Sequence, residues 1–382
     1  MYDAIIVGAR CAGSPLGMLL ARSEHRVLVV DRASFPSDTM STHFVQSPGM
    51  MRLARWGLMD RLFASNCPPI THARFDLGND NVVEFEIPLD GALRGLAAPR
   101  RHVLDKILVD AAVEAGAELA EGVSIDSLLY EDDRVAGVSG HTNDGDFEAR
   151  ARIVVGADGR HSVVARETGA GFVRNDGDSS AGYYTYFGGV STGVVETYLQ
   201  EDLFGIVFPT NDELAVVGLA WRHERFKDVK RDIEGNFFAA LDRMGDLGPR
   251  VRAGERTERF VGTADVPNYL RKVWGPGWAL VGDAGYHKDP APADGITDAF
   301  RAAEYLAEAF DEIANGADED AALTRYEQRH AETALPLLDA AVNVASFDNT
   351  PEQRFEAFIE IRLHDAHEVQ ELGTREPMTN GA

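Results

Sequence analysis

Short apolar runs separated by a glycine turn and an amphipathic stretch open the chain. Residues 4–7 (Ala-Ile-Ile-Val) are continuously apolar, as a strand buried on both faces requires. A turn containing two glycines follows over 8–13, and residues 14–22 then carry leucines at helical spacing. Residues 26–30 are expected to form a second buried strand, which ends at Asp31. This order predicts a right-handed strand–helix–strand crossover.

The hydrophobic pattern changes farther along the chain. Polar and apolar positions alternate on both sides of 78–81, which predicts a hairpin with one covered face. Residues 103–115 have apolar positions at helical spacing. Residues 183–221 are rich in β-branched and aromatic side chains and in glycine, which indicates an antiparallel sheet. Further helices are predicted over residues 47–58, 297–314, 321–344 and 352–363.

Composition narrows the class of protein. The 382 residues are 45% hydrophobic and 26% charged, as in ordinary globular domains. The net charge of -25 repels phosphate backbones and argues against a nucleic-acid partner. Two cysteines, Cys11 and Cys67, exclude a disulfide framework and fit a reducing cytoplasm. The sequence shows no secretory signal and no apolar run near the ~20 residues that span a bilayer, so we expect a cytoplasmic protein without stable membrane insertion.

The turn at Gly8–Gly13 has the spacing of a dinucleotide-binding loop. Such loops use the first glycine for a tight turn, the second for close approach of the pyrophosphate and the third for helix–strand packing. Arg10 occupies the place of the second glycine, so its side chain must point away from the phosphates or cross over them. Asp31 stands where an acid accepts hydrogen bonds from ribose hydroxyls. The loop by itself fits NAD, FAD or a site that has decayed.

Two later pairs, Asp158-Gly159 and Gly282-Asp283, follow predicted buried strands. Each could be a plain turn, since Asp and Gly are common there. Together, and in this order behind the dinucleotide loop, they make the chain resemble the FAD-dependent aromatic hydroxylase superfamily, whose fold is that of para-hydroxybenzoate hydroxylase. Flavin halogenases, geranylgeranyl reductases and squalene epoxidases belong to the same group. The resemblance extends from Tyr2 to about Ala314.

The resemblance implies an FAD molecule bound in an extended form. In such enzymes the counterpart of Asp283 meets the ribityl chain, and that of Arg101 leans on the ribose and phosphate. The counterparts of 295–297 pass under the flavin pyrimidine ring, where amides at a helix N-terminus stabilise negative charge. The implied FAD contacts are Gly8, Ala9, Arg10, Ala12, Gly13, Asp31, Arg32, Thr42, Arg101, Val123, Asp158, Gly159, Asp283, Gly295, Ile296 and Thr297.

Four residues depart from the family pattern. Pro292 stands where glycine is usual, and Thr297 replaces asparagine. Tyr286 stands where many hydroxylases have histidine. Asp294 replaces a glycine or a basic residue, and an acid facing the ring there would oppose flavin reduction.

The same resemblance implies an α/β fold with an α+β substrate domain. A discontinuous Rossmann-like FAD-binding domain is expected over residues 1–72, 95–175 and 263–314. A substrate domain built on an antiparallel sheet would take up 73–94 and 176–262. Residues 315–382 would form a C-terminal helical region.

Candidate catalytic residues lie in three places. His43 follows a loop that, in the family, runs beside the isoalloxazine ring, so it is a candidate proton carrier. The alternative is an ordinary segment that caps the next helix. Strand alternation places Tyr184 and Tyr186 on one sheet face, where they would line a pocket or pack in the core. Pro290 is the fourth candidate. The histidines are scattered, so no metal site is expected.

The primary functional expectation is an FAD-dependent monooxygenase. Reduced FAD would react with O2, form a C4a-hydroperoxide and oxidise an aromatic or polyketide-like small molecule in secondary metabolism. Electrons would come from transiently bound NADPH or NADH, or as FADH2 from a separate flavin reductase.

Three alternatives remain open. The first is an ene-reductase of the geranylgeranyl reductase type, for which Phe208-Pro209 is a motif remnant. The second is a flavin halogenase, which is disfavoured because the chain has no Trp-x-Trp-x-Ile-Pro segment and no matching lysine. The third is a non-enzymatic FAD-binding protein.

Overall fold

The apolar run at the start of the chain forms the middle of a parallel sheet. The computed structural model describes residues 1–89, 91–190 and 193–378. Strand β1 (Tyr2–Val7) lies between β2 (Val27–Asp31) and β8 (Gly145–Gly156) and runs parallel to both. Parallel strands β5 (Glu118–Glu121) and β18 (Trp278–Leu280) extend the sheet on its two sides, and β17 (Trp274–Gly275) pairs with β18. The predicted crossover is therefore confirmed.

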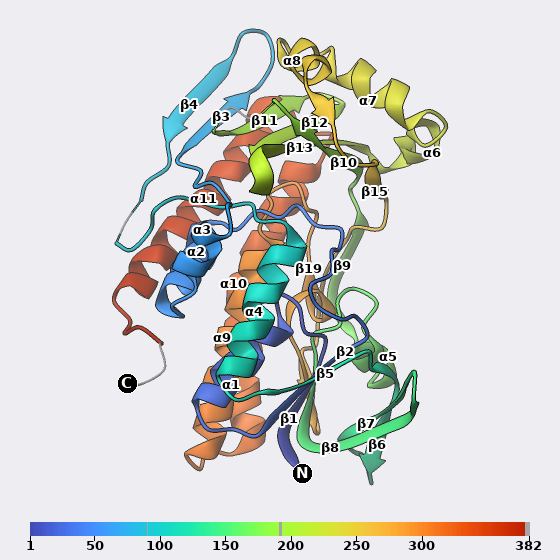
Figure 1. The fold of residues 1–382 in the computed structure, drawn as a ribbon, viewed down its shortest axis with the longest axis vertical. Helices are drawn as coiled ribbons and strands as arrows, with labels where there is room; N and C mark the ends of the chain where they lie inside the picture. Colours follow the sequence, from blue (N-terminus) through green and yellow to red (C-terminus); the bar gives the residue numbers. More distant parts are fainter. Residues whose placement is uncertain (90, 191–192, 379–382) are drawn as a thin grey trace.

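Both faces of this sheet are covered, as its buried strands require. Helix α1 (Gly13–Arg22) packs against α4 (Arg101–Glu114) and α9 (Gly295–Ala314) on one side. Strands β6 (Ser124–Glu131) and β7 (Arg134–Thr142) continue from β8 as an antiparallel meander on the other side (Figure 1). Helix α5 (Val163–Glu167) packs against β6 and β8.

A second sheet forms the other end of the molecule. Its strand order is β14-β10-β13-β12-β11-β3-β4, with β15 also paired to β10. All neighbours are antiparallel except β11 and β3, which run parallel. The bounds are β3 His72–Asp76, β4 Val82–Glu86, β10 Ser180–Gly188, β11 Val195–Gln200, β12 Leu203–Pro209, β13 Leu214–Arg222, β14 Glu255–Arg256 and β15 Val261–Thr263.

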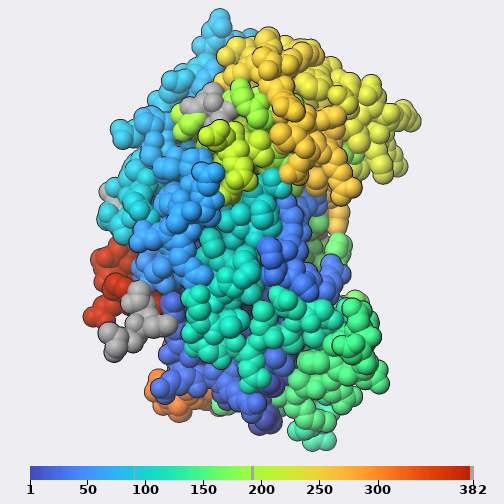
Figure 2. All heavy atoms as spheres, in the orientation of Figure 1, coloured from blue at the N-terminus to red at the C-terminus, as the bar shows by residue number. Residues whose placement is uncertain are grey.

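The two faces of this sheet have different roles. Tyr183 and Phe187 point into a separate core beneath α6 (Phe226–Val229), α7 (Ile233–Leu241) and α8 (Leu247–Ala253). These helices form the yellow upper-right part of the surface (Figure 2). Tyr184 and Tyr186 pack with the main core on the opposite face. The predicted alternation of these aromatic residues is thus confirmed.

Helices close the remaining side. Helix α10 (Glu319–Ala345) packs on α9, and α11 (Pro351–Gly373) packs on α10, α2 (Ser47–Arg55) and β11. A small sheet of β9 (Phe172–Asp178), β16 (Pro267–Arg271) and β19 (Tyr286–His287) lies between the two large sheets (Figure 1).

Some predicted helix ends were wrong. The helix predicted over 47–58 ends at Arg55, and a short α3 (Met59–Ala64) follows. The helix predicted over 352–363 continues to Gly373. Its second half buries charged side chains, among them Asp365 and Glu368, which an apolar periodicity cannot detect.

The α/β class with an antiparallel second sheet and C-terminal helices is confirmed. The domain boundaries remain a prediction, and residues 90, 191–192 and 379–382 of those ranges lie outside the described residues. Within the part of the chain that the structure covers, no helix has the length and hydrophobicity needed to cross a membrane.

Candidate functional site

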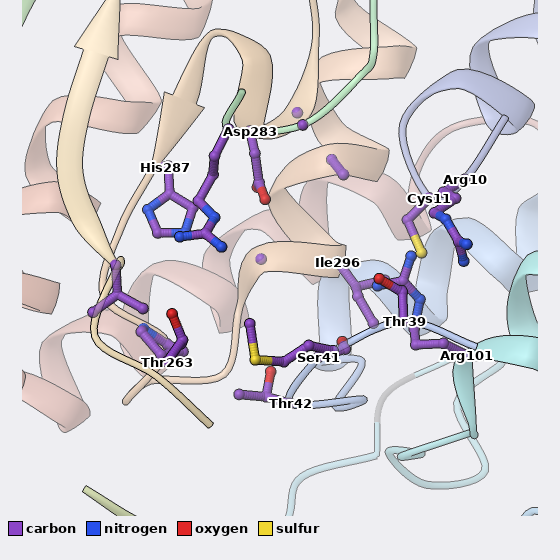
Figure 3. A pocket seen from close by; sticks show the side chains of 18 of the residues that line it. Arg10, Cys11, Thr39, Ser41, Thr42, Arg101, Thr263, Asp283, His287 and Ile296 are labelled. Carbon is purple, nitrogen blue, oxygen red and sulfur yellow. The ribbon is translucent and has the colours of Figure 1, made fainter. Parts of the chain in front are cut away.

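A cavity of about 850 Å³ extends from the glycine loop after β1 to the inner face of the second sheet. Most of the residues predicted to contact FAD line it, whereas Ala9, Gly13 and Thr297 lie behind its wall. Among the catalytic candidates, Tyr184 and Pro290 line it, and His43 and Tyr186 lie behind. In the close view, Asp283 and His287 lie across the cavity from Arg10, Cys11 and Arg101 (Figure 3).

The glycine loop allows two backbone segments to pass at very short range. Gly8 has a φ of 106°, and a Cβ there would lie 2.3 Å from the carbonyl oxygen of Ala157. A Cβ at Gly13 would lie 1.7 Å from the carbonyl oxygen of Gly8. Both glycines are needed because no side chain fits where β1, β8 and α1 converge. The loop thereby opens the start of α1 toward the cavity, where helix amides favour an anion.

Asp31 stabilises this loop from the end of β2. Its Oδ2 accepts a hydrogen bond from the amide of Ala9 at 2.7 Å, and its Oδ1 accepts one from Ala33 at 2.8 Å. Asp31 also lines the cavity. The carboxylate therefore stands at the loop, where one end of a dinucleotide would lie.

Arg10 does not project freely into the cavity. Its guanidinium donates to Asp105 at 2.5 Å and to Ser37 Oγ at 3.0 Å, and it lies over the ring of Phe35. Arg101 donates to the same Asp105 carboxylate, at 3.0 and 3.2 Å. Asp105, which is fully buried, thus holds two arginines at the cavity wall. Sequence reasoning missed Asp105, although its position four residues after Arg101 on a helix was a usable signal.

The Asp158-Gly159 turn presents an unpaired oxygen. Asp158 Oδ2 accepts the amide of Val163 at 2.7 Å, whereas its Oδ1 is buried and, in the part of the chain that the structure describes, has no hydrogen-bond partner. Burial raises the pKa of Asp158, although nearby donors act in the opposite direction. Gly159 has a φ of 77°, which explains the glycine after the acid.

The Gly282-Asp283 turn and the start of α9 form the opposite wall. Gly282 has a φ of 59°, and a Cβ there would lie 2.8 Å from the Ala12 Cβ, so the turn packs directly on the glycine loop. Gly295 and Ile296, in the first turn of α9, line the cavity. Because the first amides of a helix have no acceptor within it, they are available to a bound group.

Three of the four residues that depart from the family pattern, Thr297, Tyr286 and Asp294, each make a specific contact. Thr297 Oγ1 accepts the amide of Gln46 at 3.1 Å and so ties α9 to the segment before α2. Tyr286 is buried and donates to the carbonyl of Ala334 on α10. Asp294 is buried and bonded to Arg362 at 2.5 Å, with Lys288 at 3.3 Å. Its charge is therefore compensated.

His43 is hydrogen-bonded to Tyr186, and Tyr184 packs edge-on against both rings. His43 Nε2 and Tyr186 Oη lie 2.6 Å apart, and Tyr184 Oη accepts the amide of Ser41 at 3.4 Å. Arg100 lies 4.0 Å from the centre of the Tyr186 ring. Burial, with a smaller contribution from Arg101, lowers the pKa of His43 to about 3, so the imidazole is neutral at neutral pH.

The substrate half of the cavity is mainly apolar. Alternate residues of β12 and β13 face it: Phe204, Ile206, Phe208, Val216 and Ala220. Two charged residues interrupt this wall. Lys288 lines the cavity and is held by Asp298 at 2.9 Å, and its neighbour Asp289 is 1% exposed. Sequence reasoning did not assign either residue.

Asp289 has a free oxygen in these surroundings. Its Oδ1 accepts the amide of Ala291 at 3.0 Å, and its Oδ2 is buried and has no hydrogen-bond partner among the described residues. Burial raises the pKa of this carboxyl, against smaller effects from Ser180 and His287. The direction of this shift favours protonation of Asp289 relative to an exposed aspartate.

A group of ligand-type side chains was not expected from the sequence. His364, Asp365 and Glu368 bring ligand atoms within 4.8 Å of one another. However, Glu368 is bonded to Arg52 and Arg301, and Asp365 faces Arg362. These arginines already compensate the carboxylates and would repel a cation, so the group does not support a metal site.

The donor set fits an extended dinucleotide such as FAD. The glycine loop would hold its pyrophosphate at the start of α1, and Asp31 would lie beside one ribose. Asp158 offers an oxygen that lacks a partner, and Asp283 and the start of α9 line the way to the apolar half. The described residues place these groups along one continuous cavity.

Comparisons with known proteins agree with this geometry. A family model described as an FAD binding domain matches residues 1–341. The chain is 28% identical over 345 residues to a digeranylgeranylglycerophospholipid reductase of Methanocella arvoryzae, which covers 88% of this chain and 85% of that protein.

Solved structures share the fold. The myxobacterial chondrochloren halogenase matches with a TM-score of 0.81 and 22% identity, over 97% of this chain and 95% of that one. A Pseudomonas aeruginosa protein described as "a probable FAD-dependent monooxygenase" matches with a TM-score of 0.80 and 19% identity, over 94% of this chain and 99% of that one.

Proposed function

This chain belongs to the FAD binding domain family, and from that premise we propose that it saturates a carbon–carbon double bond in an apolar substrate. It is an FAD-dependent oxidoreductase, and the finer assignment is our proposal. The observation that carries it is the apolar wall of β12 and β13, beside a buried carboxyl that can hold a proton. The similarity to a digeranylgeranylglycerophospholipid reductase supports the same reaction type.

The wall would bind the alkene and exclude water. Phe204, Ile206 and Phe208 extend along one strand and face the cavity together. Burying apolar surface stabilises a complex by roughly 25 cal/mol for each Å², so three such side chains can hold an apolar chain without a polar anchor. A dry site also prevents protons from reaching the reacting carbon by uncontrolled routes.

When bound and reduced, FAD supplies a hydride. The neighbouring carbon then needs a proton, and Asp289 is the carboxyl in the apolar half that we assign to this role. Its Oδ2 makes no hydrogen bond to any described residue, and burial raises its pKa in the direction that favours the protonated form. Tyr184 lines the same cavity, and its hydroxyl can hydrogen-bond a polar group of the substrate.

Oxygen insertion is the second candidate. The hydrogen-bonded pair His43 and Tyr186, with the Tyr184 ring packed edge-on against Tyr186, favours it, because such a pair beside the cavity can pass a proton to a leaving oxygen. The electron donor is also a proposal: either NADPH or NADH bound directly, or reduced FAD from a separate reductase. Steady NADPH consumption by the purified protein alone would identify direct use.

The test mixes anaerobically reduced holoprotein with geranylgeraniol as the probe alkene. We expect reoxidation of the flavin without oxygen and a product with two added hydrogen atoms. Asp289→Asn should bind FAD normally and slow this step at least tenfold, because the proton source is gone. Normal turnover in that variant would remove Asp289 from the mechanism. If isoprenoid alkenes do not reoxidise the flavin under anaerobic conditions, the reductase proposal itself is contradicted.

A further inference from the structure

A chain of buried charges connects the start of α9 with the C-terminal helix. It begins at Asp294, directly before α9, where Arg362 of α11 lies at 2.5 Å and Lys288 at 3.3 Å. Lys288 also contacts Asp298 at 2.9 Å, and Asp298 contacts Arg301 at 2.5 Å. The side chains of Asp294, Asp298, Lys288 and Arg301 are all less than a tenth exposed.

The chain of charges continues away from the cavity. Arg301 binds Glu368 of α11 at 2.6 Å, and Glu368 binds Arg52 of α2 at 2.8 Å. Arg52 and Arg55 both bind Glu304, at 2.9 and 2.5 Å. The network therefore joins α2, α9 and α11 through pairs of opposite charge, and we name it the α9 charge network.

Only one end of the α9 charge network meets the cavity. Its members Lys288 and Asp298 line the cavity, and Asp294 directly precedes the lining residue Gly295. Glu304 lies ten residues after Asp294, about 15 Å farther along α9. An uncompensated carboxylate at Asp294 would place negative charge beside helix amides that otherwise favour an anion. Arg362 and Lys288 outweigh the effect of burial and lower the pKa of Asp294, so its charge persists and needs these partners.

Of the two cations that contact Asp294, Arg362 is the nearer one. Its contact is the shorter of the two, and Lys288 lies closer to Asp298 than to Asp294. Arg362 also comes from a helix that contributes no residue to the cavity lining. Charge compensation at the cavity thus depends on the docking of α11.

We propose that Arg362 is a positioning residue that acts through Asp294 to set the reduction potential of the bound flavin. This proposal rests on the proposed function in one respect, namely that the flavin binds at the start of α9. With Arg362 in place, the α9 amides face an electron-rich reduced flavin with little opposing charge. Without it, Asp294 opposes the gain of electrons.

The test is the midpoint potential of the bound flavin in Arg362→Gln, Asp294→Asn and the double variant. Arg362→Gln should shift the reduced-to-oxidised ratio about tenfold toward oxidised flavin, about 30 mV for a two-electron couple. Asp294→Asn should shift it in the opposite direction. The double variant should return toward wild type, because both charges are gone.

Arg55→Gln is the matched control, since it removes a buried arginine from the same network at its remote end. It should lower stability and leave the potential unchanged. An unchanged potential in Arg362→Gln with stoichiometric FAD, or an equal shift in Arg55→Gln, would overturn the proposal. If Arg362→Gln does not fold, an unchanged potential in Asp294→Asn overturns it equally. No substrate enters these measurements, so failure of alkene turnover leaves them interpretable.

Discussion

The cofactor half and the substrate half of the cavity are built from different kinds of structure. The cofactor half consists of turns in which backbone segments approach closely, as at Gly8 and Gly282. The substrate half consists of alternate side chains that two neighbouring strands project from one sheet face, such as Phe204 and Val216. Backbone geometry of the first kind requires particular residues at fixed spacing, whereas many apolar side chains can build the second.

This difference separates what binds the common cofactor from what selects the substrate. A change in the cofactor half should remove FAD and with it every activity. A change in the substrate half should leave FAD bound and alter recognition alone. Substitutions at Gly13 and Asp283 test the cofactor half, and a substitution at Ile206 tests the substrate half.

The largest effect is expected at Gly13. Gly13→Ala would place a Cβ 1.7 Å from the carbonyl oxygen of Gly8, so the loop or α1 must move. We expect loss of bound FAD and a large loss of stability, measured as flavin content and thermal midpoint. Gly171→Ala is the control, because a Cβ there meets nothing within 4 Å and Gly171 does not line the cavity. Full FAD content in Gly13→Ala would show that the loop is not a close-packed cofactor site.

The next effect is expected at Asp283, across the cavity from Arg101 (Figure 3). Asp283→Ala removes a carboxylate that would accept a hydrogen bond from FAD, and bonds to charged groups contribute about 1.5–3 kcal/mol. FAD affinity should fall roughly tenfold to a hundredfold, as measured by flavin fluorescence titration. Asp283→Asn should fall less, since its amide oxygen can still accept. Retention of wild-type affinity in the alanine variant would argue against this contact.

A smaller effect concerns acid stability at the junction of the two halves. The pKa of His43 is lowered to about 3 in the folded chain, while the unfolded chain titrates near the ordinary value of about 6.5. The unfolded state therefore binds more protons between these values, and stability falls as the pH falls. His43→Asn keeps a residue that tolerates the φ of 61° and removes this titration.

We measure how much unfolding free energy the wild type and His43→Asn each lose between about pH 7.5 and about pH 5. The loss should be smaller in His43→Asn by about 2 kcal/mol. His330, whose pKa is lowered to about 4 by burial, is present in both proteins and cancels. Equal losses in the two proteins would mean that His43 titrates normally.

The smallest effect is expected at Ile206, on the substrate wall. Ile206→Ala removes apolar surface from the cavity and should raise KM for an apolar substrate about tenfold, with FAD content unchanged. Val207→Ala is the control, because Val207 points to the opposite sheet face and packs under α6–α8. That variant should lose stability and keep its KM. A change of KM in Val207→Ala alone would reverse the assignment of the faces.

Sequence patterns predicted the parts of the site that depend on the backbone. The apolar run 4–7, the Gly8–Gly13 turn and the later acid–glycine pairs are local, so the chain displays them in a few consecutive residues. The faces of Tyr184 and Tyr186 followed from strand alternation, which is also local.

Sequence patterns could not predict contacts between distant segments. Arg362 and Asp294 are 68 positions apart, and no periodic pattern in the sequence links the two residues. Asp289 precedes a proline in an irregular segment, and its amide donates to Asn268 of β16, 21 positions away, so its burial follows from a contact between distant segments. The reaction also depends on the substrate half, which explains why fold and cofactor were predicted more firmly than chemistry.

One product analysis tests the central claim most directly. Reduced holoprotein, geranylgeraniol and isotopically labelled dioxygen are combined, and the product is examined by mass spectrometry. The account predicts a product in which one double bond is saturated, with two added hydrogen atoms and no labelled oxygen. A product that carries labelled oxygen would contradict the reductase assignment and identify the protein as an oxygenase.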